Sequence, residues 1–172
     1  MKRLCSAFIF TLVLTFIFSG CEKLSPKKEF QPQKAFCVHM TALKNNKIFE
    51  AQVKCNNYES IEISFTAPEE LQGFSVEATE DGYSVNVFGI PDEISRYEIN
   101  TNSLINVLVK SVKLAVFTNH GAFTQKNGYI EAQLSVDDIP VTVTFTEDGY
   151  LQSIKAQAID FSAEFEKSVD KI

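Results

Sequence analysis

The chain has 172 residues, of which 45% are hydrophobic and 22% charged, and its formal net charge is -6 at pH 7. This length predicts one domain with a substantial core, the hydrophobic content excludes a disordered chain, and the scattered 7 Gly and 5 Pro exclude a collagen-like one. The acidic balance argues against nucleic acid as a partner.

The first twenty residues have the features of a signal peptide. A basic start, Met1-Lys2-Arg3, precedes an almost unbroken apolar run over residues 4–18, which is too short to span a membrane comfortably. The run ends in Phe18-Ser19-Gly20-Cys21, which resembles the lipobox of bacterial lipoprotein precursors, with Phe where that pattern usually has Leu. The resemblance implies cleavage after Gly20 and lipid attachment at Cys21. The alternative is an ordinary secretory signal followed by an unrelated cysteine.

Residues 21–34 are expected to form a flexible tether from the lipidated cysteine. They are rich in Lys, Glu and Gln, contain Pro26 and Pro32, and show no apolar period. Two or three acyl chains on Cys21 would hold the protein stably at the extracytoplasmic side of a membrane. Without residues 1–20 the chain has 14 basic and 22 acidic residues, a formal charge of -8. The single folded domain is expected over residues 35–167.

Apolar residues alternate with period two from Ala35 onward, which predicts β-hairpins whose registers follow from their turns. A two-residue turn at Asn45-Asn46 pairs positions that sum to 91 and gives one apolar face, made of the pairs Val38–Val53, Met40–Ala51 and Ala42–Phe49. A third strand over residues 58–66 places Ile61, Ile63 and Phe65 on its buried side. A turn at Asp81-Gly82 predicts a sum of 163, which pairs Ala78 with Val85 and Val76 with Val87.

One segment, residues 103–117, has helical period, with Asn102 or Thr101 as the N-cap. Its β-branched residues lower helix propensity, so packing must hold it. Residues 91–100 show no clear period, and a short helical turn at Asp92-Glu93 is one option for them.

The remaining strands follow two further turns. Asp137-Asp138 predicts a sum of 275, which pairs Leu134 with Val141, Ala132 with Val143 and Ile130 with Phe145; Asp148-Gly149 then sets Val143 opposite Ile154 and Val141 opposite Ala156. The apolar parity changes after Ala158, which indicates either a bulge or a separate last strand. The order is therefore five strands, one helix, and three or four strands. We expect an α+β fold: a strongly twisted antiparallel sheet forming an incomplete β-barrel, with the helix packed on or plugging its concave face.

Several short motifs resemble the LolA/LolB-like group of outer-membrane lipoprotein-sorting proteins. They are Phe65-Thr66-Ala67-Pro68, Leu71, Gly73, a hairpin that ends in Gly89-Ile90, and the closing pair of strands from Val141 to Ile154. The resemblance implies an incomplete barrel plugged by helices, whose apolar hollow accepts acyl chains or a lipidated partner. A permanently anchored protein suits a receptor, a local acceptor or a sensor better than a soluble carrier.

The larger inward residues are the candidate wall of such a hollow, which would bind a lipid or a lipoprotein acyl chain. They are Met40, Phe49, Ile63, Phe65, Val85 and Phe145 from the strands, with Leu108 and Val112 from the helix. The alternative is that the same side chains fill an ordinary core. The domain would then be a surface interaction or sensing module, whose envelope protein partner binds at the edge strand near Ala35 or at residues 91–100.

Catalytic and metal-binding patterns are lacking in the sequence. His39 and His120 have no ligand-spaced partners, and the carboxylate pairs Glu69-Glu70, Asp92-Glu93 and Asp137-Asp138 lie at expected turns. We expect neither an enzyme nor a cofactor.

Cys37 and Cys55 are the thiols that remain in the expected domain, and export would permit a disulfide. A register of 91 places Cys55 opposite Phe36 and Cys37 opposite Lys54, on different faces of the sheet. A register of 92 would instead place the two cysteines opposite each other. Both alternatives stay open.

Overall fold

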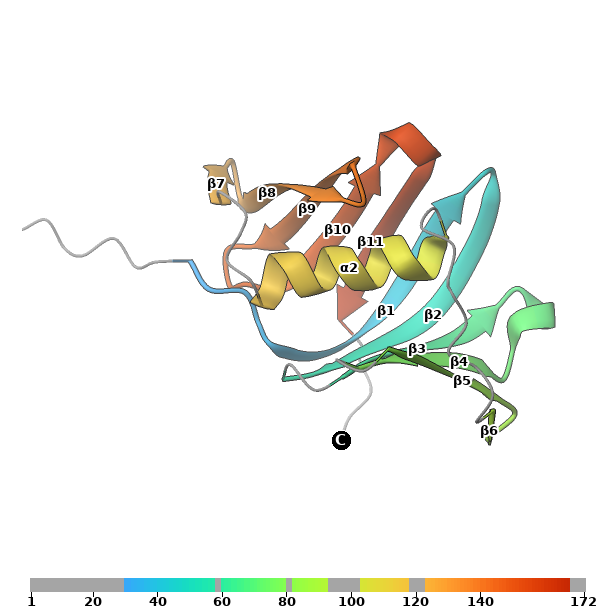
Figure 1. The fold of residues 1–172 in the computed structure, drawn as a ribbon. Coiled ribbons are helices and arrows are strands. Elements are labelled where there is room, and N and C mark those ends of the chain that lie inside the picture. The colour runs from blue at the N-terminus through green and yellow to red at the C-terminus, as the bar shows by residue number, and fades with distance from the viewer. Residues whose placement is uncertain (1–29, 58–59, 80–81, 93–102, 118–122, 168–172) are drawn as a thin grey trace, which may run out of the picture.

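A computed structural model describes residues 30–57, 60–79, 82–92, 103–117 and 123–167 (Figure 1). Six strands precede the main helix in this part of the chain: β1 (Ala35–Lys44), β2 (Lys47–Asn56), β3 (Ser60–Ala67), β4 (Phe74–Ala78), β5 (Tyr83–Val87) and β6 (Ile90–Asp92). The helix α2 (Leu104–Phe117) is followed by β7 (Phe123–Lys126), β8 (Tyr129–Val136), β9 (Ile139–Thr146), β10 (Leu151–Ala156) and β11 (Phe161–Lys167). Two short 3₁₀ helices, η1 (Glu69–Leu71) and η2 (Gln157–Ile159), complete the described elements.

These strands form one antiparallel sheet in the order β6-β5-β4-β3-β2-β1-β11-β10-β9-β8-β7. The two halves of the chain meet where β1 pairs with β11 and Met40 lies opposite Phe165. The sheet curls around α2 but does not close, since β6 and β7 are its two ends (Figure 1). The predicted α+β fold, an incomplete barrel with one main helix, is confirmed.

Helix α2 crosses the concave face and supplies much of the core (Figure 1). Val107, Leu108 and Val112 are fully buried against the sheet. Val is a weak helix former, so this burial rather than propensity stabilises the helix. The Ser103 hydroxyl caps the helix by accepting a hydrogen bond from the Asn106 N–H at 3.1 Å, whereas the predicted N-caps, Asn102 and Thr101, lie outside the described residues.

Most predicted registers are confirmed. The β1–β2 pairs sum to 91, the β8–β9 pairs sum to 275, and Val143 lies opposite Ile154. The turn residues Asn45, Asn46, Asp137 and Asp138 have φ angles of 50°, 60°, 48° and 66°, the left-handed conformation that a two-residue hairpin turn needs. The change of parity after Ala158 reflects a separate last strand, β11, which follows η2.

The register of the β4–β5 hairpin was predicted wrongly. Its pairs sum to 161 instead of 163, so Val76 faces Val85 and Ala78 faces Tyr83. The Thr79 N–H donates a hydrogen bond to the Gly82 carbonyl at 2.9 Å, so Gly82 faces Thr79 directly before β5 and is not a central residue of the turn. A shift of two residues keeps each side chain on its own face, so Val76 and Ala78 are still buried.

Two strands and one domain boundary also differ from the prediction. Asp92 belongs to strand β6 and not to a helical turn, whereas residues 93–100 and His120 lie outside the described residues. Strand β7 was not predicted, because its residues after Phe123 are polar and exposed. The folded domain begins before Ala35, since residues 30–34 already pack on it.

Cys37 and Cys55 are both free thiols, as the register of 91 predicts. Cys37 is exposed on one face and Cys55 is buried on the other. Burial raises the pKa of the Cys55 thiol to about 11. The disulfide alternative is therefore wrong. Among the described residues, no helix is both long and apolar enough to cross a membrane.

Candidate functional site

The eight residues predicted to line a hollow lie mainly in the packed core beneath α2. Met40, Ile63, Leu108, Val112 and Phe145 are 0% exposed, and Phe65 is 6% exposed. These six belong to one continuous hydrophobic cluster, and Phe49 is half-buried against it. Val85 is half-buried in β5. A ligand could reach the fully buried members only if α2 moved away, and their role in ligand binding stays a prediction.

A polar network at the first turns of α2 holds the helix over the sheet. The Tyr83 hydroxyl donates to Asn106 Oδ1 at 3.4 Å, and Asn106 Nδ2 donates to Asp137 Oδ2 at 2.9 Å. Lys110 Nζ lies 2.6 Å from the same carboxylate oxygen. The Lys110 hydrogen bond, helped by that of Asn106, lowers the pKa of Asp137, whereas desolvation raises the pKa of Tyr83. The network joins α2 to β5 and to the β8–β9 turn.

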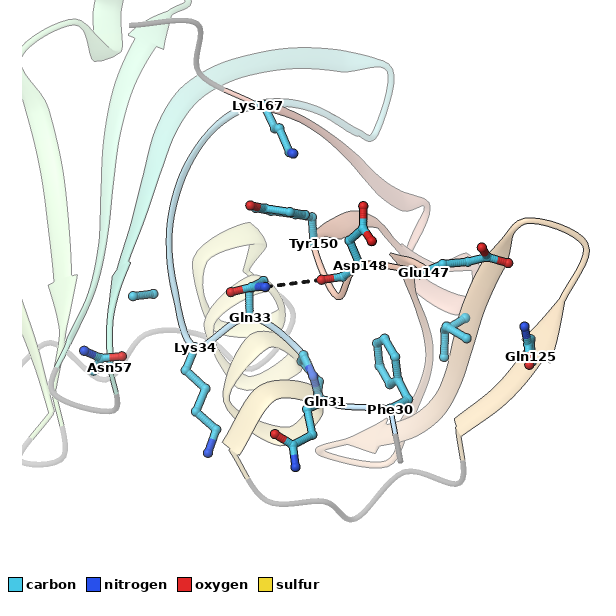
Figure 2. Close-up of a pocket in the computed structure, with 13 residues that line it drawn as sticks. Phe30, Gln31, Gln33, Lys34, Asn57, Gln125, Glu147, Asp148, Tyr150 and Lys167 are labelled. Atoms are coloured by element: carbon cyan, nitrogen blue, oxygen red, sulfur yellow. Dashed lines mark hydrogen bonds between the residues drawn. The ribbon is translucent and has the colours of Figure 1, made fainter. Parts of the chain in front are cut away.

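An open pocket of about 1180 Å³ lies where residues 30–34, here called the N-terminal strap, cross one end of the sheet (Figure 2). The strap and the start of β1 form one wall. The other lining residues come from strands and turns far along the chain: Asn57, Gln125, Ile130, Glu147, Asp148, Tyr150 and Lys167. None of the eight predicted wall residues lines this pocket.

Three kinds of contact fix the strap in place. The Gln33 N–H donates to the Gly149 carbonyl at 2.8 Å, and its side-chain amide donates to the Asp148 carbonyl at 3.2 Å. The Phe30 ring packs against the rings of Phe123 and Phe145, at centroid distances of 4.9 and 5.6 Å. The pocket wall is therefore built by the fold, and aromatic contacts of this geometry add to its stability.

The pocket carries charges of both signs. Glu147, Asp148, Lys34 and Lys167 line it, and each is exposed. Lys167 Nζ lies 3.7 Å from the centroid of the Tyr150 ring, a cation–π contact. Figure 2 shows Lys167 and Asp148 on one side of the strap and Lys34 on the other.

Sequence reasoning missed this pocket because it assigned residues 21–34 to a flexible tether. One signal could have shown otherwise: Phe30 is a large apolar residue in an otherwise polar stretch, and such a residue is more stable when buried. The pairing of the strap with the Asp148-Gly149 turn leaves no local pattern, since the partners are more than 100 residues apart.

The histidine and metal expectations can be checked in part. His39 is half-buried on β1, opposite Gln52 and Glu166 on its two neighbouring strands. Over residues 30–57, 60–79, 82–92, 103–117 and 123–167, no group of three or more His, Cys, Asp or Glu residues could hold a metal ion.

Comparisons with known proteins give a similarity to solved structures but none to a family or a curated protein. No family model matches the chain, and no curated protein matches it. Among solved structures, it is similar to a LolA superfamily protein from Nitrosomonas europaea, with a TM-score of 0.37 and 14% identity, over 81% of this chain and 67% of that one. A similarity of this size carries no inference about function. The fold assignment rests instead on the strand order and on the position of α2.

Proposed function

We propose that this protein is a lipid-anchored component of a bacterial cell envelope, held by Cys21 at the extracytoplasmic side of a membrane, whose domain binds its partner through its surface. The burial of the concave face is the observation that supports surface binding. Five of the eight candidate wall residues are 0% exposed, so the space that a ligand would need is filled by side chains.

The anchoring part of the proposal comes from the sequence. The basic start, the apolar run and the Phe18-Ser19-Gly20-Cys21 motif together fit a lipoprotein precursor. Residues 21–29 then connect the anchor to the strap. We propose a binding role and not an enzymatic one, because the sequence contains no nucleophile, metal or nucleotide fingerprint.

A second candidate function is binding of a lipid or acyl chain between α2 and the sheet, as the LolA/LolB-like resemblance implies. One observation favours it. The Ser111 hydroxyl on α2 is fully buried and has no hydrogen-bond partner among the residues that the structure describes, which costs about 1–3 kcal/mol in the closed position of the helix. Movement of α2 would relieve this cost and expose an apolar trough lined by Met40 and Leu108.

A photoreactive fatty acid tests the two candidates on the full-length lipoprotein in vesicles. The filled-core proposal predicts that a probe with a diazirine at its chain end leaves no cross-link on β1 or α2. Reproducible labelling of Met40 or Leu108 would contradict it and support the second candidate. The intact mass of the denatured protein tests the anchor, because the proposal predicts a chain that begins at Cys21 and carries acyl groups.

A further inference from the structure

We propose that the strap pocket binds the headgroup of a membrane phospholipid that carries both a phosphate and a primary ammonium group, as ethanolamine lipids do. This inference rests on the proposed anchoring and names the partner of the anchored surface. It follows from the position, the charges and the rigidity of the pocket.

The position of the pocket is set by the length of the chain that precedes it. Phe30 follows Cys21 by only nine residues, which span at most about 30 Å even when fully extended. An anchor at Cys21 therefore keeps the end of the domain that carries the strap close to the bilayer. A lipid headgroup is the ligand present there at high effective concentration, so a weak intrinsic affinity is sufficient for occupancy.

The charges of the pocket favour a zwitterion over an anion. On the side of the strap that carries Lys167, the lining also contains the carboxylates of Asp148 and Glu147, so an ammonium group and carboxylates stand together in the wall and an anion alone is disfavoured. A lysine ammonium binds a phosphate as a point charge, and a carboxylate accepts charge-assisted hydrogen bonds from an ammonium group. A pocket of about 1180 Å³ is large enough for a headgroup and its glycerol.

The Tyr150 ring favours ethanolamine over choline. Aromatic faces bind quaternary ammonium groups, which donate no hydrogen bonds. In this pocket Lys167 Nζ already occupies a position 3.7 Å from the centroid of the Tyr150 ring (Figure 2). The carboxylates of Glu147 and Asp148 in the lining accept hydrogen bonds, so they favour a ligand that donates them. A primary ammonium does so and a choline group does not.

The strap is held before any ligand arrives. Gln33 is hydrogen-bonded through its backbone to Gly149 and through its side chain to the Asp148 carbonyl, and Phe30 is packed in an aromatic cluster. Little ordering of the wall is therefore needed on binding, and pre-organisation of this kind raises affinity.

Amide hydrogen exchange of the full-length lipoprotein in vesicles tests the inference. Vesicles of phosphatidylcholine alone are compared with mixtures that also contain phosphatidylethanolamine or phosphatidylglycerol. We expect slower exchange over residues 30–35 and 146–150 with phosphatidylethanolamine only. The variants Lys167→Gln and Glu147→Gln should each weaken the apparent affinity for that lipid about tenfold.

The matched control is Lys155→Gln, which removes an exposed lysine of β10 that does not line the pocket. It should leave the protection unchanged. Equal protection in all three vesicle types would overturn the inference, and it would indicate that residues 22–29 or no ligand occupy the pocket. Equal losses in the pocket and control variants would overturn it as well.

Two further readouts separate the possible failures. Soluble glycerophosphoethanolamine should compete with the lipid only at millimolar concentration. If that compound protects the pocket at micromolar concentration, the inference that the headgroup belongs to a lipid is overturned. An intact mass without acyl groups on Cys21 would refute the anchoring, and the inference would fail with it. Acylated protein that does not distinguish the lipids refutes the headgroup site alone.

Discussion

Gly149 lies so close to Gln31 that a β-carbon at position 149 would stand 2.6 Å from the Gln31 carbonyl oxygen. The φ angle of Gly149 is +86°, which is unfavourable for residues with a side chain. Gly149→Ala should therefore destabilise the domain by more than about 1 kcal/mol and detach the strap. Chemical denaturation measures the first effect and hydrogen exchange at Gln33 the second. Gly128→Ala, at a φ of +83° with open space around it, controls for backbone strain alone.

Asp137 should make the domain more stable at neutral pH than in acid. Its folded-state pKa is lowered below the ordinary value of 3.8 by the Lys110 and Asn106 hydrogen bonds. The stabilisation is therefore complete above the unfolded-state pKa and disappears as the pH falls through the folded-state pKa. Asp137→Asn, which suits the positive φ of this turn, should reduce the loss of stability between neutral pH and pH 3.

Denaturation curves at several pH values measure this effect. Glu131→Gln is the control variant for Asp137→Asn, because it removes another carboxyl group whose pKa is lowered. In Glu131 the chief cause is the hydrogen bond from Gln133. The Asp137 prediction is refuted if Asp137→Asn and the wild-type protein lose equal stability over that pH range.

Phe88 is 78% exposed and has a φ of 53°. The other described non-glycine residues with positive φ are all Asn or Asp, which tolerate this conformation. Phe88→Asn should therefore leave stability unchanged or raise it by up to about 1 kcal/mol. Thermal unfolding measures the change. A clear loss of stability would show that the packing of the Phe88 ring beside Gly73 outweighs the backbone strain.

The Cys21→Ser variant should lose the label when cells are fed a radioactive or clickable fatty acid, because the proposed acyl groups are attached to that sulfur or to the amino group that cleavage creates. Cys37→Ser should keep the label. Gel fluorography of both variants beside the wild-type protein measures this, and an unlabelled wild-type protein would contradict the anchor.

The two domain cysteines should differ sharply in reactivity. Cys37 is exposed, whereas Cys55 is buried and its pKa is raised to about 11, so its thiol stays protonated and inaccessible at neutral pH. A thiol reagent should modify only Cys37 in the folded domain and both after unfolding. Thiol counting by mass spectrometry checks this, with Cys37→Ser as the control. Two thiols modified at equal rates in the folded protein would contradict the structure.

Much of the fold could be predicted because the alternation of apolar and polar residues and the residue types of the turns indicate the same strand pairs. Asn45-Asn46 and Asp137-Asp138 are each flanked by strands in which apolar residues alternate clearly, so the register of a two-residue turn is also the register that gives one apolar face. The turn near Gly82 offered two registers that leave the same residues buried, and the pattern could not distinguish them. The Asp-Gly pair favoured the wrong one.

The candidate site was harder to predict because burial and contact are three-dimensional properties. The prediction that Met40 and Phe145 lie on the inner face of the sheet was correct. The alternation of residues along a strand does not tell whether α2 fills the space above that face. The strap pocket joins Gln33 to Gly149 through backbone hydrogen bonds, and such bonds place little demand on the residue types involved. Phe30 is the one residue of the strap pocket that could have been noticed in the sequence.

The pairing of β1 with β11 constrains how this domain reaches its native state. The strands at the centre of the sheet are the first and the last of the described strands, and positions 40 and 165 lie side by side. Contacts between such distant positions carry a large loop-closure entropy and slow the folding of a chain. A chain that is synthesised from its N-terminus must therefore wait for β11 before its core is complete. Until then its apolar face stays uncovered, and a partly folded species of this kind is prone to aggregation.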